Sequence, residues 1–273
     1  MFGKLLKYEF HYLIRIFGPM WALVLGMSLL SRIFFPKDAD RFLEMVANDS
    51  TAAGAFNVLL TVTFMALIAM MAVMAVVLIQ RFYKGMFGDE GYLMFTLPVS
   101  SGQLINAKML GALVMNVGTS IVFMLSLGIL LFYSDLWEML GGELYFVWQE
   151  LAAEQLGIAL SIFWLVITAL AATIANLYMV YLAMALGQLW RKHPVAGAIL
   201  AFYGMTIVLS ILGSIAVAMF GNTLPELFLT MEDTNPTMLM TMSSLVQIAE
   251  SVVLSVVCFA GTKWMLDKKL NIA

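Results

Sequence analysis

The first 17 residues combine a basic stripe with one carboxylate in an unexpected place. Successive helical residues turn by about 100°, so one face of a helix would collect four basic side chains, Lys4, Lys7, His11 and Arg15. The opposite face would collect apolar side chains, and such a helix lies on a membrane surface. The sequence therefore predicts an amphipathic interfacial helix over residues 1–16.

Glu9 falls in the middle of the apolar face, where an unpaired carboxylate is costly. Two interpretations remain open. In the functional one, Glu9 forms an ion pair or hydrogen bond with another cytoplasmic segment or with a partner subunit. In the other, its carboxylate reaches past the apolar face to water, or the helix rotates locally.

The sequence contains no recognisable catalytic or nucleotide-binding motif. It lacks a Gly-x-x-x-x-Gly-Lys-Ser/Thr phosphate loop, a His-Glu-x-x-His zinc motif and a Gly-x-Ser-x-Gly nucleophile motif. His11 and His193 lie in different segments, and the single cysteine, Cys258, lies in an apolar stretch. We therefore expect no enzyme activity, no cofactor or metal site and no disulfide in this chain, and no nucleic-acid partner.

The residues discussed so far are positioned by apolar stretches that are long enough to cross a bilayer. The 273 residues are 63% hydrophobic and 11% charged, with a mean hydropathy of +0.96. A hydrocarbon core requires about 20 apolar residues per helix, because a helix satisfies its own backbone polar groups. The sequence predicts an all-α integral membrane protein, with a single transmembrane domain over residues 1–273 and six spans near 17–35, 55–80, 104–133, 157–186, 194–221 and 245–266.

The positions of the basic residues predict the orientation of these spans. All but three of the 14 Lys and Arg residues fall on one side, the exceptions being Arg32, Lys37 and Arg41. Basic residues resist translocation, so that side is cytoplasmic and holds both termini of a multi-pass protein of the cell (plasma) membrane. Most acidic residues lie on the other side, so the net charge of −3 conceals a basic inner face suited to anionic lipid headgroups.

The middle of each span lacks ionisable residues, which argues against an ion-coupled carrier. Arg32 and Glu250 fall near outer span ends, where they are interfacial or paired. Neutral polar residues within spans either line a substrate path or join helices by hydrogen bonds, and we favour helix packing. They are Asn57, Thr61, Thr63, Asn116, Thr119, Ser120, Thr173 and Asn176.

The cytoplasmic link between the second and third spans is the most distinctive segment. Its three glycines, Gly85, Gly88 and Gly91, allow tight turns, and an apolar run over 92–97 ends at Pro98. Ser100 and Gln103 then form a capping box that starts the third span. Exposed apolar residues on the cytoplasmic side favour the binding of a partner.

The link also carries a resemblance to a known family. The run Gly-Asp-Glu-Gly-Tyr-Leu-Met-Phe-Thr-Leu-Pro-Val-Ser over 88–100, followed by Leu104 and Lys108, resembles permease subunits of type-2 ABC transporters from Gram-positive bacteria. The segment Lys-Tyr-Glu-Phe over 7–10 is similar too. The resemblance implies that the link receives force from a separate ATPase through Gly88, Asp89, Glu90, Gly91, Tyr92, Leu93, Phe95 and Pro98.

The resemblance further implies the partners and the activity. The permease would pair with a second copy, identical or different, and dock ABC-type ATPase subunits that bind ATP and Mg. It would export an apolar or amphipathic substrate, such as a lipid, a peptide antibiotic or a drug. The alternative is a membrane scaffold or sensor that transports nothing and recruits a cytosolic partner through the same link.

Overall fold

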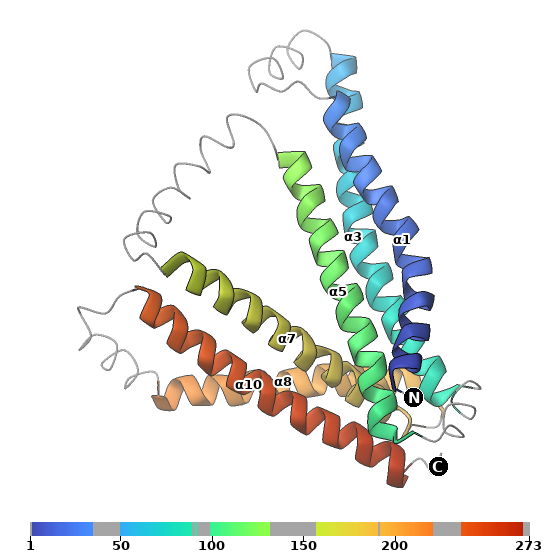
Figure 1. Ribbon diagram of the computed structural model, residues 1–273, viewed down its shortest axis with the longest axis vertical. Coiled ribbons are helices and arrows are strands. Elements are labelled where there is room, and N and C mark those ends of the chain that lie inside the picture. The colour runs from blue at the N-terminus through green and yellow to red at the C-terminus, as the bar shows by residue number, and fades with distance from the viewer. Residues whose placement is uncertain are drawn as a thin grey trace. The chain divides into compact units, whose positions relative to one another are not determined.

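The computed structural model describes residues 2–34, 50–88, 91, 99–131, 157–190, 192–220 and 236–269, nearly all of which are helical. Within this part of the chain, six helices are long and apolar enough to cross a membrane. They confirm the all-α class and are six candidate membrane spans. Figure 1 shows them as α1 (Phe2–Phe34), α3 (Ser50–Phe87), α5 (Ser101–Leu131), α7 (Gly157–Gly187), α8 (Pro194–Phe220) and α10 (Pro236–Trp264). A π-helix, η1 (Met265–Lys269), continues α10.

Local sequence signals set several helix starts. The predicted capping box precedes α5: the Gln103 amide donates to Ser100 Oγ at 3.4 Å, and the Ser100 amide donates to Gln103 Oε1 at 3.3 Å. These bonds satisfy backbone donors that have no partner within the helix. α8 and α10 each begin with a proline, whose missing amide hydrogen costs nothing at a first helical position.

The main departure from the sequence prediction is at α1. Residues 2–17 and the first span form one continuous helix that includes Pro19, so a separate interfacial helix over 1–16 is not shown. Part of the apolar face predicted to lie on the membrane packs instead against neighbouring helices, since Leu13 and Phe17 are buried, whereas Phe10 on the same face is 41% exposed. With 33 residues, α1 is about 50 Å long, against about 30 Å of hydrocarbon.

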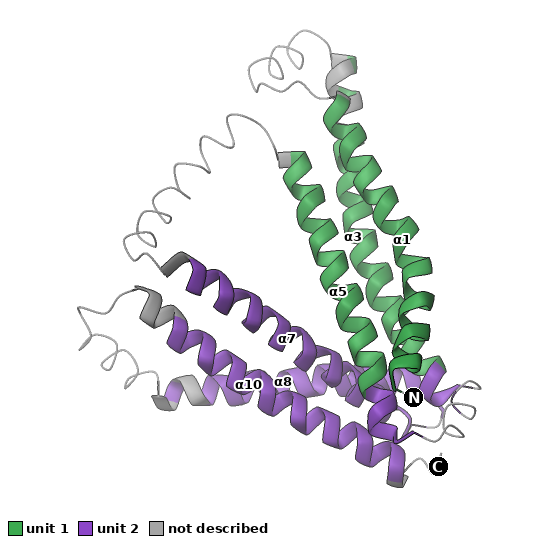
Figure 2. Ribbon diagram, in the orientation of Figure 1, with its two compact units in different colours: residues 1–84, 106–149 green, residues 85–105, 150–273 purple. Residues whose placement is uncertain are grey.

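The packing of the chain divides it into two compact units, coloured separately in Figure 2. Unit 1 is Met1–Lys84 with Asn106–Gln149, and unit 2 is Gly85–Ile105 with Glu150–Ala273. The chain therefore leaves unit 1 near the end of α3 and returns to it after the first turn of α5. The single transmembrane domain stays a prediction.

Unit 1 is built from α1, α3 and most of α5, which run side by side (Figure 2). Its buried core takes residues from all three helices, namely Val24, Leu67, Met70, Val122 and Leu130. Several hydrogen bonds join the helices. Among them, Trp21 Nε1 donates to Thr119 Oγ1 at 3.0 Å, and the hydroxyls of Ser31 and Thr63 lie 2.8 Å apart. Thr63 and Thr119 thus join helices, as the packing interpretation predicted.

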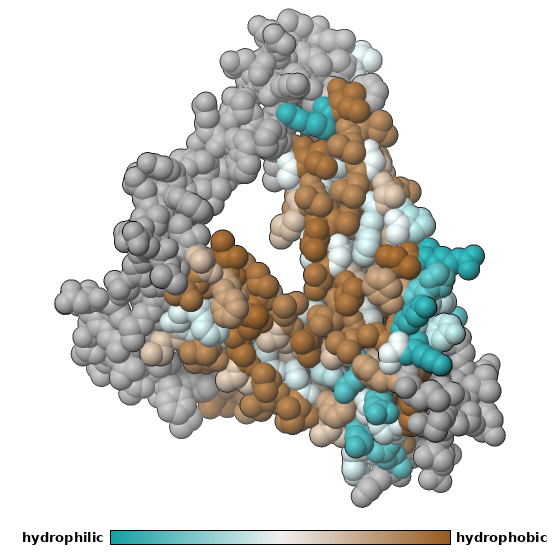
Figure 3. Space-filling model, in the orientation of Figure 1, coloured by the Kyte–Doolittle hydropathy of each residue, from teal (hydrophilic) through white to brown (hydrophobic). Residues whose placement is uncertain are grey.

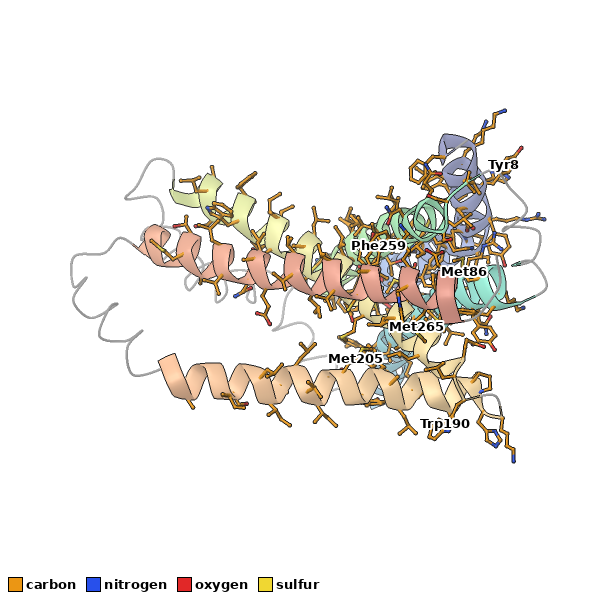
Figure 4. The ribbon with its side chains drawn as sticks, turned by 90° about the horizontal axis from the view of Figure 1, so that it is seen from below. Tyr8, Met86, Trp190, Met205, Phe259 and Met265 are labelled. Atoms are coloured by element: carbon orange, nitrogen blue, oxygen red, sulfur yellow. The ribbon has the colours of Figure 1, made fainter. Side chains whose placement is uncertain are left out.

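Unit 2 packs α7 against both α10 and α8. Tyr178 of α7 and Phe259 of α10 meet edge to face, with ring centroids 5.6 Å apart. α8 comes close to α7 beside the turn that carries Trp190, as Figure 4 shows. A side chain at Gly187 would place its Cβ 2.5 Å from the amide nitrogen of Ala198, so only glycine permits this approach.

The contact between α7 and α8 yields a first prediction. Gly187→Ala should lower the free energy of unfolding by about 1–3 kcal/mol, because the added methyl group meets backbone atoms that cannot move alone. Thermal unfolding of the purified protein in a neutral detergent measures this loss. The matched control is Gly204→Ala in α8, whose Cβ would meet nothing within 4 Å. Equal stability of the two variants would contradict the prediction.

Candidate functional site

The carboxylate of Glu9 joins three helices of unit 1. Its Oε1 accepts hydrogen bonds from Lys108 Nζ at 2.9 Å and from Arg81 Nη2 at 3.2 Å, and its Oε2 accepts one from Arg81 Nε at 2.9 Å. The side chains of Glu9, Lys108 and Arg81 are only 5%, 4% and 17% exposed. We call these three residues the Glu9 bridge. The structure agrees with the first interpretation of Glu9, in which its carboxylate forms an ion pair.

The surrounding residues explain how the bridge forms. Glu9 lies one and two turns before Leu13 and Phe17, whose burial turns this face of α1 into the bundle. Gly111 of α5 lies beside Glu9, since a Cβ there would make an ordinary van der Waals contact of 3.6 Å with Glu9 Cβ. The guanidinium of Arg81 also stacks over the ring of Tyr12, with its Cζ 4.3 Å from the centroid.

Burial makes the three charges of the bridge depend on one another. Desolvating an ion costs several kcal/mol, and only close, well-oriented partners offset that cost. Arg81 presents two donors to the two carboxylate oxygens, the geometry for which a guanidinium is suited. Two cations share one carboxylate, so loss of Glu9 would leave two like charges close together.

The bridge fixes both helices that flank the predicted coupling link. Arg81 lies about two turns before Gly88 in α3, and Lys108 lies about two turns after Ser100 in α5. Both are bound to the same carboxylate of α1. A displacement of either flank therefore acts on α1 as well.

The link itself is described at its two ends. The Gly91 amide donates to the Gly88 carbonyl at 2.8 Å, and a Cβ at Gly91 would lie 2.8 Å from the Met86 carbonyl oxygen, so this turn requires glycine. The other predicted coupling residues lie outside the described part of the chain, and their role stays a prediction. They are Asp89, Glu90, Tyr92, Leu93, Phe95 and Pro98.

The far end of the link is fastened within unit 2. Ser101 Oγ donates to Asp267 Oδ1 of η1 at 2.6 Å. A Cβ at Gly102 would lie 3.3 Å from Phe259 Cζ, so the first turn of α5 lies directly on α10. Figure 4 shows Phe259 and Met265 toward the same end of unit 2 as Met86. Sequence reasoning missed Asp267, because nothing local marks two residues so far apart in the chain.

The remaining predicted site residues lie on the outside of α1. Lys4, Lys7, His11 and Arg15 are all exposed and form the predicted stripe. Arg32 belongs to unit 1 and Glu250 to unit 2, and the pair considered between them stays a prediction. Among the residues that the structure describes, no group of three His, Cys, Asp or Glu side chains could hold a metal ion.

The fold and this site define a multi-pass membrane protein. Comparisons of the chain with protein-family models, with curated proteins and with solved structures found no match. Any more specific function therefore depends on the residues of the site and on the resemblance of the link.

The Glu9 bridge yields a second prediction. Glu9→Gln should lower the free energy of unfolding by about 3–5 kcal/mol, because it leaves two buried cations without their carboxylate. Lys108→Met should cost less, since Glu9 keeps Arg81 as its partner. Thermal unfolding in a neutral detergent measures both losses.

A triple variant separates the loss of charge pairing from the loss of shape. Glu9→Leu combined with Arg81→Met and Lys108→Met removes all three charges, and replacing a buried ionic cluster with apolar residues is often neutral or stabilising. The triple variant should therefore be more stable than Glu9→Gln. The electrostatic account of the bridge fails if the triple variant is equally unstable.

Proposed function

We propose that this chain is the permease subunit of a type-2 ABC transporter, which moves an apolar or amphipathic substrate outward with energy from separate ATPase subunits. The observation that carries the proposal is the attachment of the link at both flanks. The Glu9 bridge holds α3 and α5 to α1, and Ser101 holds the start of α5 to η1. A segment with the sequence of a coupling link is thus joined to helices of each unit.

The link can transmit force because its flanks are stiff. Two turns of α3 separate Gly88 from Arg81, and two turns of α5 separate Ser100 from Lys108. A push by an ATPase on residues 88–98 would therefore reach the Glu9 bridge through continuous helix. Packed helices change between discrete arrangements rather than deforming continuously, so such a push would shift spans between inward-facing and outward-facing states.

The proposed docking chemistry divides between charged and apolar residues of the link. Asp89 and Glu90 would pair with basic residues of the ATPase, and Tyr92, Leu93 and Phe95 would enter a groove on its surface. Both termini and the link would be cytoplasmic, in agreement with the distribution of basic residues. ATP and Mg would bind to the ATPase, so this chain would carry no catalytic residue.

The substrate path would form where two permease subunits meet, with an identical or a different second copy. The spans expose mainly apolar side chains, which suits a lipid, a peptide antibiotic or a drug better than a small ion. The transporter would work in the cell membrane, where binding of the substrate shifts the population between the two states.

A charge reversal in the link tests the proposed docking. Asp89→Lys with Glu90→Lys should weaken association with the ATPase by roughly tenfold or more, because each reversal replaces attraction with repulsion. Membrane insertion should not change, since both residues lie outside the spans. Copurification measures the association, and Lys192→Glu, an exposed charge reversal in the turn between α7 and α8, is the control. Normal association of the double variant would count against the docking role.

The rate of ATP hydrolysis by the complex reconstituted in lipid distinguishes a permease from a scaffold or sensor. A permease should raise the ATPase rate of the reconstituted complex when its substrate is added. A scaffold or sensor would bind its partner through the same link without substrate-stimulated hydrolysis. If no ABC-type ATPase binds at all, the proposed function is wrong.

The bond between Ser101 and Asp267 yields a further prediction that rests on the same proposal. Ser101→Ala should leave ATPase association intact but lower substrate transport per ATP hydrolysed by several-fold, since a lost hydrogen bond of about 1 kcal/mol loosens the link from η1. Parallel assays of hydrolysis and transport in vesicles give this ratio. The control is Ser214→Ala, because the Ser214 hydroxyl bonds only within its own helix in the contacts described. An unchanged ratio would show that this attachment does not couple.

A further inference from the structure

The outward face of α1 carries a row of basic side chains. Lys4, Lys7, His11 and Arg15 are exposed, whereas Glu9 points into the bundle. Within the described part of unit 1, Glu9 is the only carboxylate. Figure 3 shows this hydrophilic surface over the first half of α1.

The same face continues into the apolar half of α1. Because α1 is one continuous helix, residues that are four or seven positions apart lie on nearly the same face of it. Ala22, Leu29 and Ile33 therefore lie in line with His11 and Arg15. Ala22 is exposed, as are Leu29 (51%) and Ile33 (74%). One exposed face thus changes from apolar to basic between Ala22 and Arg15.

This change matches the boundary between hydrocarbon and headgroups. α1 is a candidate membrane span, so its exposed apolar residues face lipid chains. The basic residues on the same face then meet the headgroups of those lipids. Tyr8 and Tyr12 are also exposed here, and tyrosine is enriched at this depth of a membrane.

We propose that the basic face of α1, made by Lys4, Lys7, His11 and Arg15, binds the anionic headgroups of phospholipids. A lipid fits this face better than an acidic protein does, because the face is continuous with lipid-exposed side chains of the same helix. This proposal goes beyond the transport function and does not depend on it.

The Glu9 bridge gives the face its direction. By fastening α1 to α3 and α5, it fixes the rotation of the helix about its axis and keeps the basic residues turned outward. The row from Lys4 to Arg15 is about 17 Å long, which exceeds the thickness of one headgroup layer. Arg15 therefore meets headgroups first, and the residues before it extend toward the aqueous side.

Lipid selectivity of the full chain tests the proposal. The protein is reconstituted in phosphatidylcholine vesicles that contain spin-labelled phosphatidylglycerol or spin-labelled phosphatidylcholine, and electron spin resonance gives the relative binding constant of the two lipids. Wild type should prefer phosphatidylglycerol. Arg15→Gln should reduce the preference by roughly fivefold, and adding Lys4→Gln should reduce it further by a smaller factor, because Lys4 lies farther from the headgroups. The control, Lys84→Gln with Lys192→Gln, removes two exposed charges elsewhere and should reduce it less.

Two outcomes would overturn the proposal. One is an equal loss of the preference for phosphatidylglycerol in the control and in the variant that lacks Lys4 and Arg15. This result would indicate a general effect of charge. The other is binding of a soluble acidic polypeptide, such as polyglutamate, to the stripe without any preference for phosphatidylglycerol, which would indicate an acidic protein partner. Because the substituted side chains are exposed, thermal unfolding in phosphatidylcholine should be unchanged, so a loss of preference cannot be attributed to misfolding.

Discussion

A carboxylate buried among membrane helices must be matched by charge and by hydrogen bonds, and unit 1 is organised around one such group. Glu9 brings a guanidinium from α3 and an ammonium from α5 to the same two oxygen atoms. This requirement fixes the rotation of α1, the approach of α5 at Gly111 and the outward direction of the basic stripe. The bridge lies about two turns from each flank of the link, so it stiffens the helices that enter and leave that segment.

Along the rest of the spans, packing has to work without a hydrophobic driving force, since lipid chains are as apolar as the side chains. The helices meet instead through small residues and short hydrogen bonds. Trp21 lies over Gly118 and bonds to Thr119, and the Ser31 hydroxyl meets that of Thr63. In unit 2, Gly187 allows α7 and α8 to touch through their backbones. These contacts explain the presence of the neutral polar residues Thr63 and Thr119 within the spans.

The link combines local order with distant attachment. Its glycine turn and the cap at Ser100 are properties of the link sequence, whereas the bond from Ser101 to Asp267 joins it to the other end of the chain. Residues 85–105 pack with unit 2, although the helices that they extend belong to unit 1. This division agrees with the proposed role of the link, because the link packs with unit 2 and continues into helices of unit 1.

The sequence by itself determined the six spans, the cap at Ser100 and the need to pair Glu9, because these follow from hydropathy, from the spacing of Ser100 and Gln103, and from the cost of a carboxylate on an apolar face. It could not identify the partners of Glu9, since Arg81 and Lys108 are basic residues like several others on that side. Only the tertiary structure decided that residues 2–17 continue into the span, because burial of Leu13 and Phe17 against neighbouring helices competes with the membrane surface for the same apolar face. It likewise decided the contact of Ser101 with Asp267, which depends on how α5 and α10 pack and on no local pattern.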